Sequence, residues 1–167
     1  MFEITPITSR NELDCGATCL KMLLAYYGTD VPLETLSREC RTRAVGCTLL
    51  DIKKAGAKHG LDMHAYKIDG EEVIRQDRPS IVWWGHNHFC VCGGRDESGK
   101  VVIYDPDRGR YRLTEGSFNS IYSGIALFNG IPDDLPDDPA QGGELTAEER
   151  QRLNELEELA EALMEVF

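Results

Sequence analysis

The segment DCGATCLKMLLAYYG, residues 14–28, contains the strongest structural signal in the chain. Its apolar residues occupy most sides of a helical wheel, which predicts a buried helix over residues 15–27. Asp14 is a suitable N-cap for that helix, and Gly28 is a suitable residue to end it. Cys15 lies in the first turn, where the positive end of the helix dipole stabilises a thiolate. Because a cysteine at a helix start is more often a small buried residue, this position alone does not identify a nucleophile.

After this helix the pattern changes from helical to strand-like. Two short helices are predicted over residues 32–40 and 49–59, with Pro32 in the first turn of one and Gly60 just after the other. Short apolar or alternating runs then predict a series of strands. The predicted strands cover residues 61–68, 80–84, 88–92, 101–104, 111–113 and 125–128. Helices followed by antiparallel strands indicate an α+β fold in which the N-terminal helices pack on the sheet.

The C-terminal part of the chain differs sharply in composition. Residues 131–143 are rich in Pro, Asp and Gly and predict a linker after a main domain of residues 1–130. A capping-box pattern at Thr146 and leucines at helical spacing predict an amphipathic helix over residues 144–167. Everything after residue 130 holds twelve acidic and two basic side chains, which accounts for −10 of the formal net charge of −11. Because nucleic-acid binding needs clustered basic side chains, no nucleic-acid partner is expected.

The chain shows no sign of export, membrane insertion or metal binding. No basic start followed by an apolar stretch marks a signal peptide, and no apolar run is long enough to cross a bilayer. The cytoplasm is therefore the expected location, and the six cysteines are expected to be free thiols. Cys90 and Cys92 should share one face of a strand, but no second pair at metal-ligand spacing accompanies them. Neither a metal nor another cofactor is expected.

Two polar side chains beyond the first helix complete a candidate catalytic set. His88, in the run GHNHFCVC, opens a predicted strand, and His86 should share its face as a competing base. Asp105 ends the strand VVIY and opens the turn DPDRG. Taken singly, a histidine at a strand edge and an aspartate before proline are usually structural. A general base needs an orienting partner, however, and Cys15, His88 and Asp105 follow the chain order of papain-like enzymes.

Three ordered motifs resemble those of the bacteriocin-processing, or double-glycine leader, peptidases. These are the papain-like domains at the N-terminus of peptidase-containing ABC transporters. DCGATCLKMLLAYYG is similar to their nucleophile motif around Cys15, and YDPDRG is similar to their Asp-Pro turn at Asp105. PSIVWWGHNHFCV resembles their histidine motif and assigns the base to His88 rather than His86. TLLDIKKAGAKHGL and SFNSIYSGIALF resemble a following helix and the last helix and strand, so the likeness covers residues 5–129.

This resemblance implies a cysteine endopeptidase that cleaves leader peptides after a double-glycine-type site. Cys15 would attack the peptide, His88 would move the protons, and Asp105 would orient the imidazole. The implied partners are a peptide substrate with a Gly-Gly leader and an ABC transporter, which would hold the chain at the inner face of the membrane. Trp83 and Trp84 are candidate walls of a narrow substrate cleft, although large aromatic residues more often serve packing. The oligomeric state does not follow from the sequence.

The chain departs from this family at the oxyanion hole. The family has a glutamine six residues before the cysteine, whereas this chain has Ser9 there and an amide, Asn11, nearby. Losing one oxyanion donor costs a hydrolase about 10²–10³ in rate. The main alternative is therefore a catalytically impaired domain that binds leader peptides without cleaving them. An acyl-transferring enzyme and a structural thiol protein are further alternatives.

The acidic helix predicted over residues 144–167 has two interpretations. Its leucine stripe would pack on its own domain or on a second copy of the chain. Alternatively, it would mimic an acidic amphipathic leader and occupy the leader groove. The sequence leaves both interpretations open.

Overall fold

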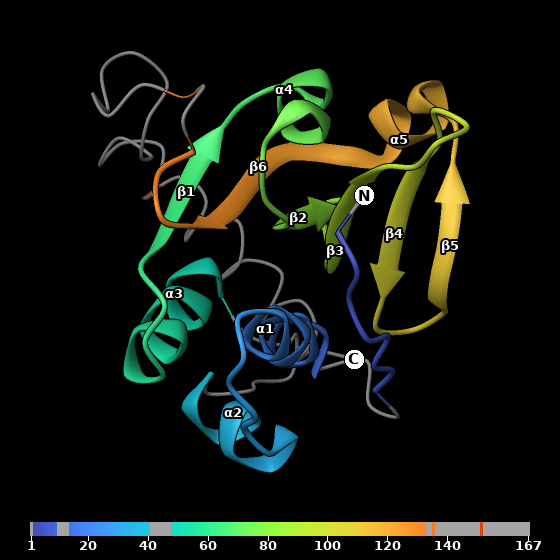
Figure 1. Ribbon diagram of the computed structural model, residues 1–167. Helices are drawn as coiled ribbons and strands as arrows, with labels where there is room; N and C mark the ends of the chain where they lie inside the picture. Colours follow the sequence, from blue (N-terminus) through green and yellow to red (C-terminus); the bar gives the residue numbers. More distant parts are fainter. Residues whose placement is uncertain (1, 10–13, 41–47, 133–134, 136–150, 152–167) are drawn as a thin grey trace, which may run out of the picture.

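The central helix of the fold is α1 (Cys15–Tyr26), which packs against the sheet (Figure 1). The computed structural model describes residues 2–9, 14–40, 48–132, 135 and 151. Nine of the twelve residues of α1 are buried, which confirms the predicted buried helix. Asp14 occupies the N-cap position, but its side chain makes no capping hydrogen bond to the helix as described. Gly28 follows the helix with a φ of 90°, a conformation that favours glycine.

Two shorter helices pack on α1 and complete the helical layer. The helix α2 (Leu33–Glu39) begins directly after Pro32, whose fixed φ suits a helix start. The helix α3 (Leu49–Lys58) begins with a capping box in which the Thr48 hydroxyl accepts a hydrogen bond from the backbone N–H of Asp51, and the Asp51 carboxylate accepts one from Thr48. Both helices therefore form where the sequence predicts them.

Six antiparallel strands form one sheet in the order β1-β6-β2-β3-β4-β5. The strands are β1 (Met63–Lys67), β2 (Ser80–Trp84), β3 (His88–Arg95), β4 (Val101–Asp105), β5 (Gly109–Leu113) and β6 (Tyr122–Asn129). Each predicted strand is present, and the α+β class with helices on an antiparallel sheet is confirmed. The strand β3 lies near the middle of the sheet and contacts α1.

Two helices lie among the strands and were not indicated by hydrophobic periodicity. They are α4 (Gly70–Arg75) and α5 (Glu115–Ile121), and they are too short to show a clear period. Asp69 and Thr114 cap them through side-chain oxygens that accept backbone N–H bonds. The expectation that all helices precede all strands is therefore wrong, although the family resemblance did place a helix before the last strand. Figure 1 shows α4 and α5 away from the layer formed by α1, α2 and α3.

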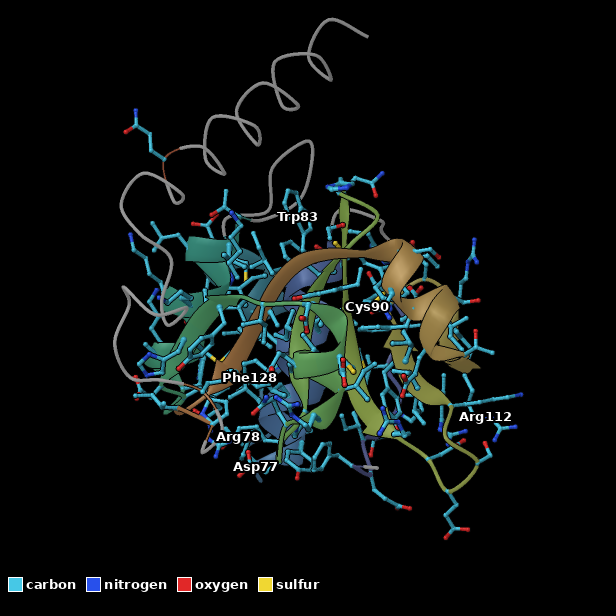
Figure 2. All side chains as sticks on the ribbon, turned by 90° about the horizontal axis from the view of Figure 1, so that it is seen from above. Asp77, Arg78, Trp83, Cys90, Arg112 and Phe128 are labelled. Atoms are coloured by element: carbon cyan, nitrogen blue, oxygen red, sulfur yellow. The ribbon has the colours of Figure 1, made fainter. Side chains whose placement is uncertain are left out.

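Alternation along the strands divides the core into two clusters. Phe89 and Val91 of β3 join the cluster that contains α1, whereas Cys90 and Cys92 join the cluster beneath α4 and α5. The shared face predicted for the two cysteines is thereby confirmed. Figure 2 shows Cys90 and Phe128 inside the fold. Each fully buried side chain of leucine size contributes about 1.5–3 kcal/mol to folding, so both clusters are substantial.

An N-terminal segment, residues 2–9, is attached to the sheet at both of its ends. The Phe2 N–H donates to the Gly93 carbonyl at 2.8 Å, and the Ser9 N–H donates to the Pro106 carbonyl at 2.8 Å. A Cβ at Gly93 would lie 2.7 Å from the ring of Tyr104, so only glycine fits at this position without displacing that ring. The segment therefore runs beside β3 and β4 before the chain enters α1.

The predicted C-terminal linker and helix lie outside the described residues, except for four positions. These are Ile131, Pro132, Leu135 and Gln151. The predicted domain boundaries and both interpretations of the acidic helix therefore stay predictions. Among the described residues, no helix is long and apolar enough to span a membrane.

Candidate active site

His88 is the first residue of β3 and follows a tight turn that joins β2 to β3. Gly85 and His86 in that turn have φ values of 61° and 63°, which point the chain sharply into the new strand. His86 therefore lies in the exposed turn, where its ring packs edge-on against Trp83 at 5.5 Å between centroids. The expectation that His86 shares the face of His88 is wrong, because alternation begins only after the turn.

Asp105 is the last residue of β4 and lies beside the start of β3. The two strands are antiparallel, with Val91 opposite Tyr104, so the beginning of one meets the end of the other. The His88 Nε2 atom lies 2.9 Å from the Asp105 Oδ1 atom. A second carboxylate, on Asp107, lies 3.7 Å from the same nitrogen, but that side chain is 42% exposed. Sheet pairing thus brings together two residues that are seventeen positions apart.

The carboxylate of Asp105 is only 4% exposed and is held by several donors. Its Oδ1 accepts the backbone N–H of Asp107 at 2.8 Å, and its Oδ2 accepts the hydroxyl of Tyr111 at 3.0 Å. The Cys90 thiol is also hydrogen-bonded to it. Burial alone would raise the pKa of Asp105, but the bonds from His88, the Asp107 backbone and Tyr111 lower it to about 2. The carboxylate is therefore ionised at neutral pH.

Cys15 reaches this pair from the helical layer. It is the first residue of α1 and is 5% exposed. A side-chain hydrogen bond joins it to His88. Because Nε2 of His88 faces Asp105, Nδ1 is the ring nitrogen that remains for the thiol. Burial lowers the pKa of His88, but the bonds to Asp105 and Cys15 outweigh it and raise the pKa to about 10, so the ring is protonated at neutral pH.

Three buried thiols near this site, those of Cys19, Cys90 and Cys92, stay protonated at neutral pH. Burial raises the pKa of Cys19 well above its usual range, and burial together with the Asp105 carboxylate does the same for Cys90. Burial raises the pKa of Cys92 to about 11. All five cysteines that the structure describes are free, as expected. Among the described cysteines, Cys15 is the one that is hydrogen-bonded to the protonated His88 ring.

Three supporting groups were missed by reasoning from the sequence. Cys90, Asp107 and Tyr111 surround the Asp105 carboxylate, and two of them donate to it through side chains. The position of Cys90, two residues after His88 on one strand, was a usable signal because such residues share a face. Tyr111 gave no such signal, because its approach depends on how β5 pairs with β4.

One group of side chains has metal-ligand chemistry. Donor atoms of His88, Cys90 and Asp105 lie within 4.8 Å of one another, the one such group found in the described part of the chain. Metal binding requires a thiolate, whereas burial and Asp105 both raise the pKa of Cys90. The imidazole and the thiol are also already bonded to the carboxylate. The three groups therefore fit a hydrogen-bonded cluster better than a metal site.

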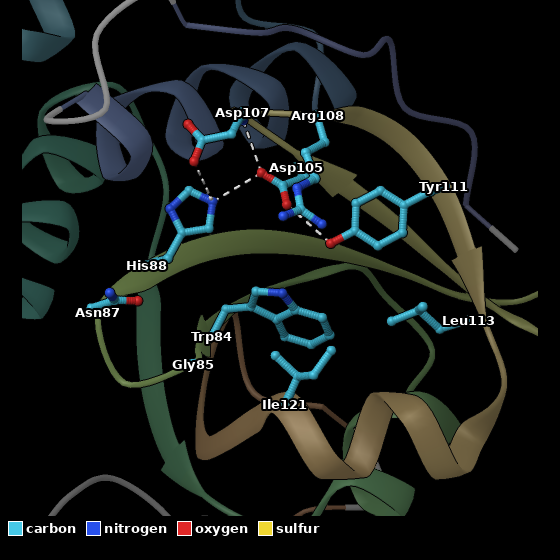
Figure 3. A pocket seen from close by; sticks show the side chains of 10 residues that line it. All are labelled: Trp84, Gly85, Asn87, His88, Asp105, Asp107, Arg108, Tyr111, Leu113 and Ile121. Carbon is cyan, nitrogen blue, oxygen red and sulfur yellow. Dashed lines mark hydrogen bonds and ion pairs between the residues drawn. The ribbon is translucent and has the colours of Figure 1, made fainter.

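A cavity of about 650 Å³ opens beside His88 and Asp105 (Figure 3). Trp84 lines it and is 6% exposed. Trp83 is not among its lining residues; it packs half-buried against the helix-side core. The two tryptophans, both predicted to form cleft walls, thus have different surroundings, and a substrate-binding role for either stays a prediction.

The two candidate oxyanion donors differ in what the structure describes. Ser9 is half-buried, and its backbone is bonded to Pro106, the residue after Asp105. It therefore lies close to the candidate acid. Asn11 lies outside the described residues. The oxyanion hole accordingly stays a prediction.

Comparison with known proteins agrees with the fold and the motifs. A family model described as the Peptidase C39 family matches residues 4–130. The fold and this match define a cysteine peptidase domain with helices packed on an antiparallel sheet. The chain belongs to the peptidase C39 family, as the sequence motifs indicated.

Similar proteins include a larger processing and transport protein and two solved structures. The chain is 30% identical over 128 residues to the lactococcin-G-processing and transport ATP-binding protein LagD of Lactococcus lactis, covering 73% of this chain and 18% of LagD. A double glycine motif protease from an AMS/PCAT transporter, solved in complex with the leader peptide, is 31% identical with a TM-score of 0.73 and covers 76% of this chain and 91% of its own. The peptidase domain of Streptococcus ComA, at 23% identity and a TM-score of 0.68, covers 77% of this chain and 97% of its own and supports the fold.

Proposed function

We propose that this domain cleaves the leader from a peptide substrate after a double-glycine-type site, using Cys15, His88 and Asp105. The observation that carries the proposal is the position of His88, which is hydrogen-bonded both to Cys15 and to Asp105. A nucleophile, a base and an orienting acid in mutual contact are what acyl transfer requires. Similarity to a double glycine motif protease bound to a leader peptide supports this choice of substrate.

In the first step, the Cys15 sulfur would attack the carbonyl carbon of the scissile bond. The protonated His88 lies beside the sulfur and is hydrogen-bonded to it, and the thiolate form of Cys15 performs this attack. His88 then gives its proton to the leaving amine, and the leader stays attached to Cys15 as a thioester. The ionised Asp105 stabilises the charged imidazole and keeps Nδ1 directed toward the sulfur.

In the second step, a water molecule would attack the thioester. His88, neutral after the first step, accepts the proton of that water, and the bond between the sulfur and the acyl carbon breaks. The leader leaves as a free acid and Cys15 returns to its thiolate form. The negative charge on the carbonyl oxygen needs donors in both steps, and we assign this task to the Cys15 backbone N–H together with Ser9 or Asn11.

A transporter is the partner that this proposal implies. LagD is named as a processing and transport protein, and the chain spans only 18% of its length. We therefore propose that the domain acts on leader peptides beside an ABC transporter, on the cytoplasmic side of the membrane. Cleavage there would separate the leader from its cargo at the point of export.

The decisive experiment compares the unaltered protein with Cys15→Ala on a panel of Gly-Gly leader peptides. Unaltered protein should release the leader as a free acid, and Cys15→Ala should release none. Cys19→Ala is a matched control, because Cys19 lies one turn further along α1 and is fully buried. It should keep most of the activity. Processing by both proteins, or by neither, would contradict the peptidase assignment.

The second candidate function is binding of leader peptides without cleavage. It is favoured by one observation, the serine at position 9 where the family has glutamine. A domain of this kind would bind leader peptides with equal affinity before and after Cys15→Ala and would leave them intact. Calorimetric titration beside the cleavage assay separates the two functions. Introducing Ser9→Gln should raise the cleavage rate if the missing donor limits a working enzyme.

A further inference from the structure

We propose that the cavity beside His88 binds the first side chain on the cargo side of the cleaved bond and prefers a bulky apolar residue there. This inference rests on the proposed function and adds a second determinant of specificity to it. The occupant is a residue of the substrate, so the cavity would be filled before the bond is cut and emptied when the cargo leaves.

The place of the cavity relative to the two reacting side chains assigns it to the cargo side. Its lining includes His88 and Asp105 but not Cys15. The acyl part of a substrate becomes bonded to Cys15, whereas the amine part receives its proton from His88. A cavity that borders the proton donor and not the nucleophile therefore lies on the side of the site toward which the leaving amine carries its side chain.

The lining of the cavity has two unlike walls. Figure 3 shows Trp84, Ile121 and Leu113 together, facing the polar side chains around Asp105. Part of the apolar wall is open to solvent. Ile121 is a large hydrophobic residue, yet it is 37% exposed. An apolar side chain that enters the cavity would cover this surface, which is worth about 25 cal/mol for each Å² removed from water.

The cavity is built by elements that are held together in the free protein. The Gly85 N–H donates to the Ile121 carbonyl at 3.0 Å, which fixes the turn before His88 to the end of α5. The Trp84 ring packs against Phe118 of α5 with centroids 5.4 Å apart. The cavity is therefore formed in advance, and its volume of about 650 Å³ is within the usual range for ligand sites.

Desolvation selects against an acidic occupant. The polar wall carries both signs of charge, since His88 and Arg108 line it together with Asp105 and Asp107. A carboxylate that enters the cavity would lose its hydration against the apolar wall of Trp84, Ile121 and Leu113. Leucine should therefore be favoured over aspartate as the first cargo residue.

The test uses leader peptides that differ only in the first residue after Gly-Gly: leucine, glycine or aspartate. The ratio of kcat/KM for leucine over aspartate should be roughly tenfold or more, as for other apolar pockets. Ile121→Asp should reduce the ratio for leucine over glycine to near one, because it removes part of the apolar wall, while the affinity for an isolated leader peptide stays unchanged. Ile131→Asp is the matched control, because Ile131 is 38% exposed and is not among the lining residues. It should keep the full ratio.

A second measurement needs no altered protein. Leucinamide or glycinamide is added during turnover, and its amine attacks the thioester in place of water, giving its proton to His88 and releasing the leader as an amide. Leucinamide should divert several-fold more product than glycinamide, because it occupies the cavity. Equal diversion by the two amines, or an unchanged leucine preference in Ile121→Asp, would overturn this inference while leaving the peptidase intact. Absence of any cleavage would instead overturn the proposed function.

Discussion

The helical layer and the sheet contribute to the candidate active site in unequal ways. The helical layer supplies one candidate side chain, Cys15, at the first residue of a buried helix. The sheet supplies His88 and Asp105 and two further side chains, Cys90 and Tyr111, that are bonded to the acid. The helix places its residue by local geometry, whereas the sheet must pair β3, β4 and β5 in register first. Most of the organisation of the site therefore depends on contacts between distant parts of the sequence.

The largest effect is expected from the acid on the sheet side. Asp105→Asn should lower the cleavage rate by about 10³-fold or more, because an amide no longer stabilises the protonated imidazole. Asp107→Asn is the matched control: its carboxylate is farther from His88, at 3.7 Å, and it should lose less than about tenfold. Steady-state kinetics on one leader peptide measures both. Equal losses of rate in the two variants would show that the hydrogen bond between His88 and Asp105 has no special role in catalysis.

An intermediate effect is expected on the pH dependence of stability. The folded pKa of His88 is about 10, above its usual value of 6.5, so its contribution is complete below about 6.5 and is lost as pH rises toward 10. The free energy of unfolding, relative to His88→Gln, should fall over that interval by more than about 1.4 kcal/mol, the equivalent of one pKa unit. Urea titrations of both proteins at several pH values measure the difference. A constant difference would mean that His88 is neutral in the folded protein.

At low pH, Asp105 gives stability a pH dependence of the opposite sign. The pKa of Asp105 is lowered from 3.8 to about 2, so its contribution is present above about 3.8 and is lost as pH falls toward 2. The contributions of His88 and Asp105 to stability are therefore both complete between about pH 3.8 and pH 6.5. The same urea titrations, extended to low pH with Asp105→Asn, test this second limit.

The smallest effect is expected from the thiol behind the acid. Cys90→Ala removes one hydrogen bond to Asp105, which is worth about 1 kcal/mol, and should slow cleavage about fivefold. Cys92→Ala is the matched control, since Cys92 lies two residues on along β3 and is equally buried. Both variants lose a similar volume and should lose similar stability. A slower rate in Cys90→Ala alone identifies the thiol as a positioning residue.

What the sequence predicted, and what it missed, follows this division between local and long-range structure. Hydrophobic pattern and helix-end residues predicted α1, α2 and α3. These helices could be predicted locally, because a helix makes its backbone hydrogen bonds within one stretch of sequence. The motif resemblance then brought His88 and Asp105 into one set, which strand periodicity alone would not have done. The short helices α4 and α5 gave no periodic signal, because one or two turns carry too little of it, and only the motif resemblance placed a helix before the last strand.

The supports of the acid and the cavity were beyond the sequence for the same reason. Tyr111 reaches Asp105 through the pairing of β4 with β5, and Ile121 reaches the cavity from the end of α5. His86 was misplaced because two successive positive φ angles at the turn interrupt the strand alternation before it begins. Each case depends on backbone geometry that residue types indicate only weakly.

The attachment of residues 2–9 to the sheet has a consequence for heat inactivation. Backbone hydrogen bonds at Phe2 and Ser9 hold this segment, the Phe2 carbonyl also accepts the Tyr104 hydroxyl at 3.3 Å, and Ile4 is the buried residue among its described positions. A terminal segment of this kind opens at lower free energy than the core. The chain continues from this segment into the helix that begins with Cys15. Opening of residues 2–9 would therefore weaken the contact between the Cys15 sulfur and His88. Catalysis would therefore cease several degrees below the temperature at which the sheet itself melts.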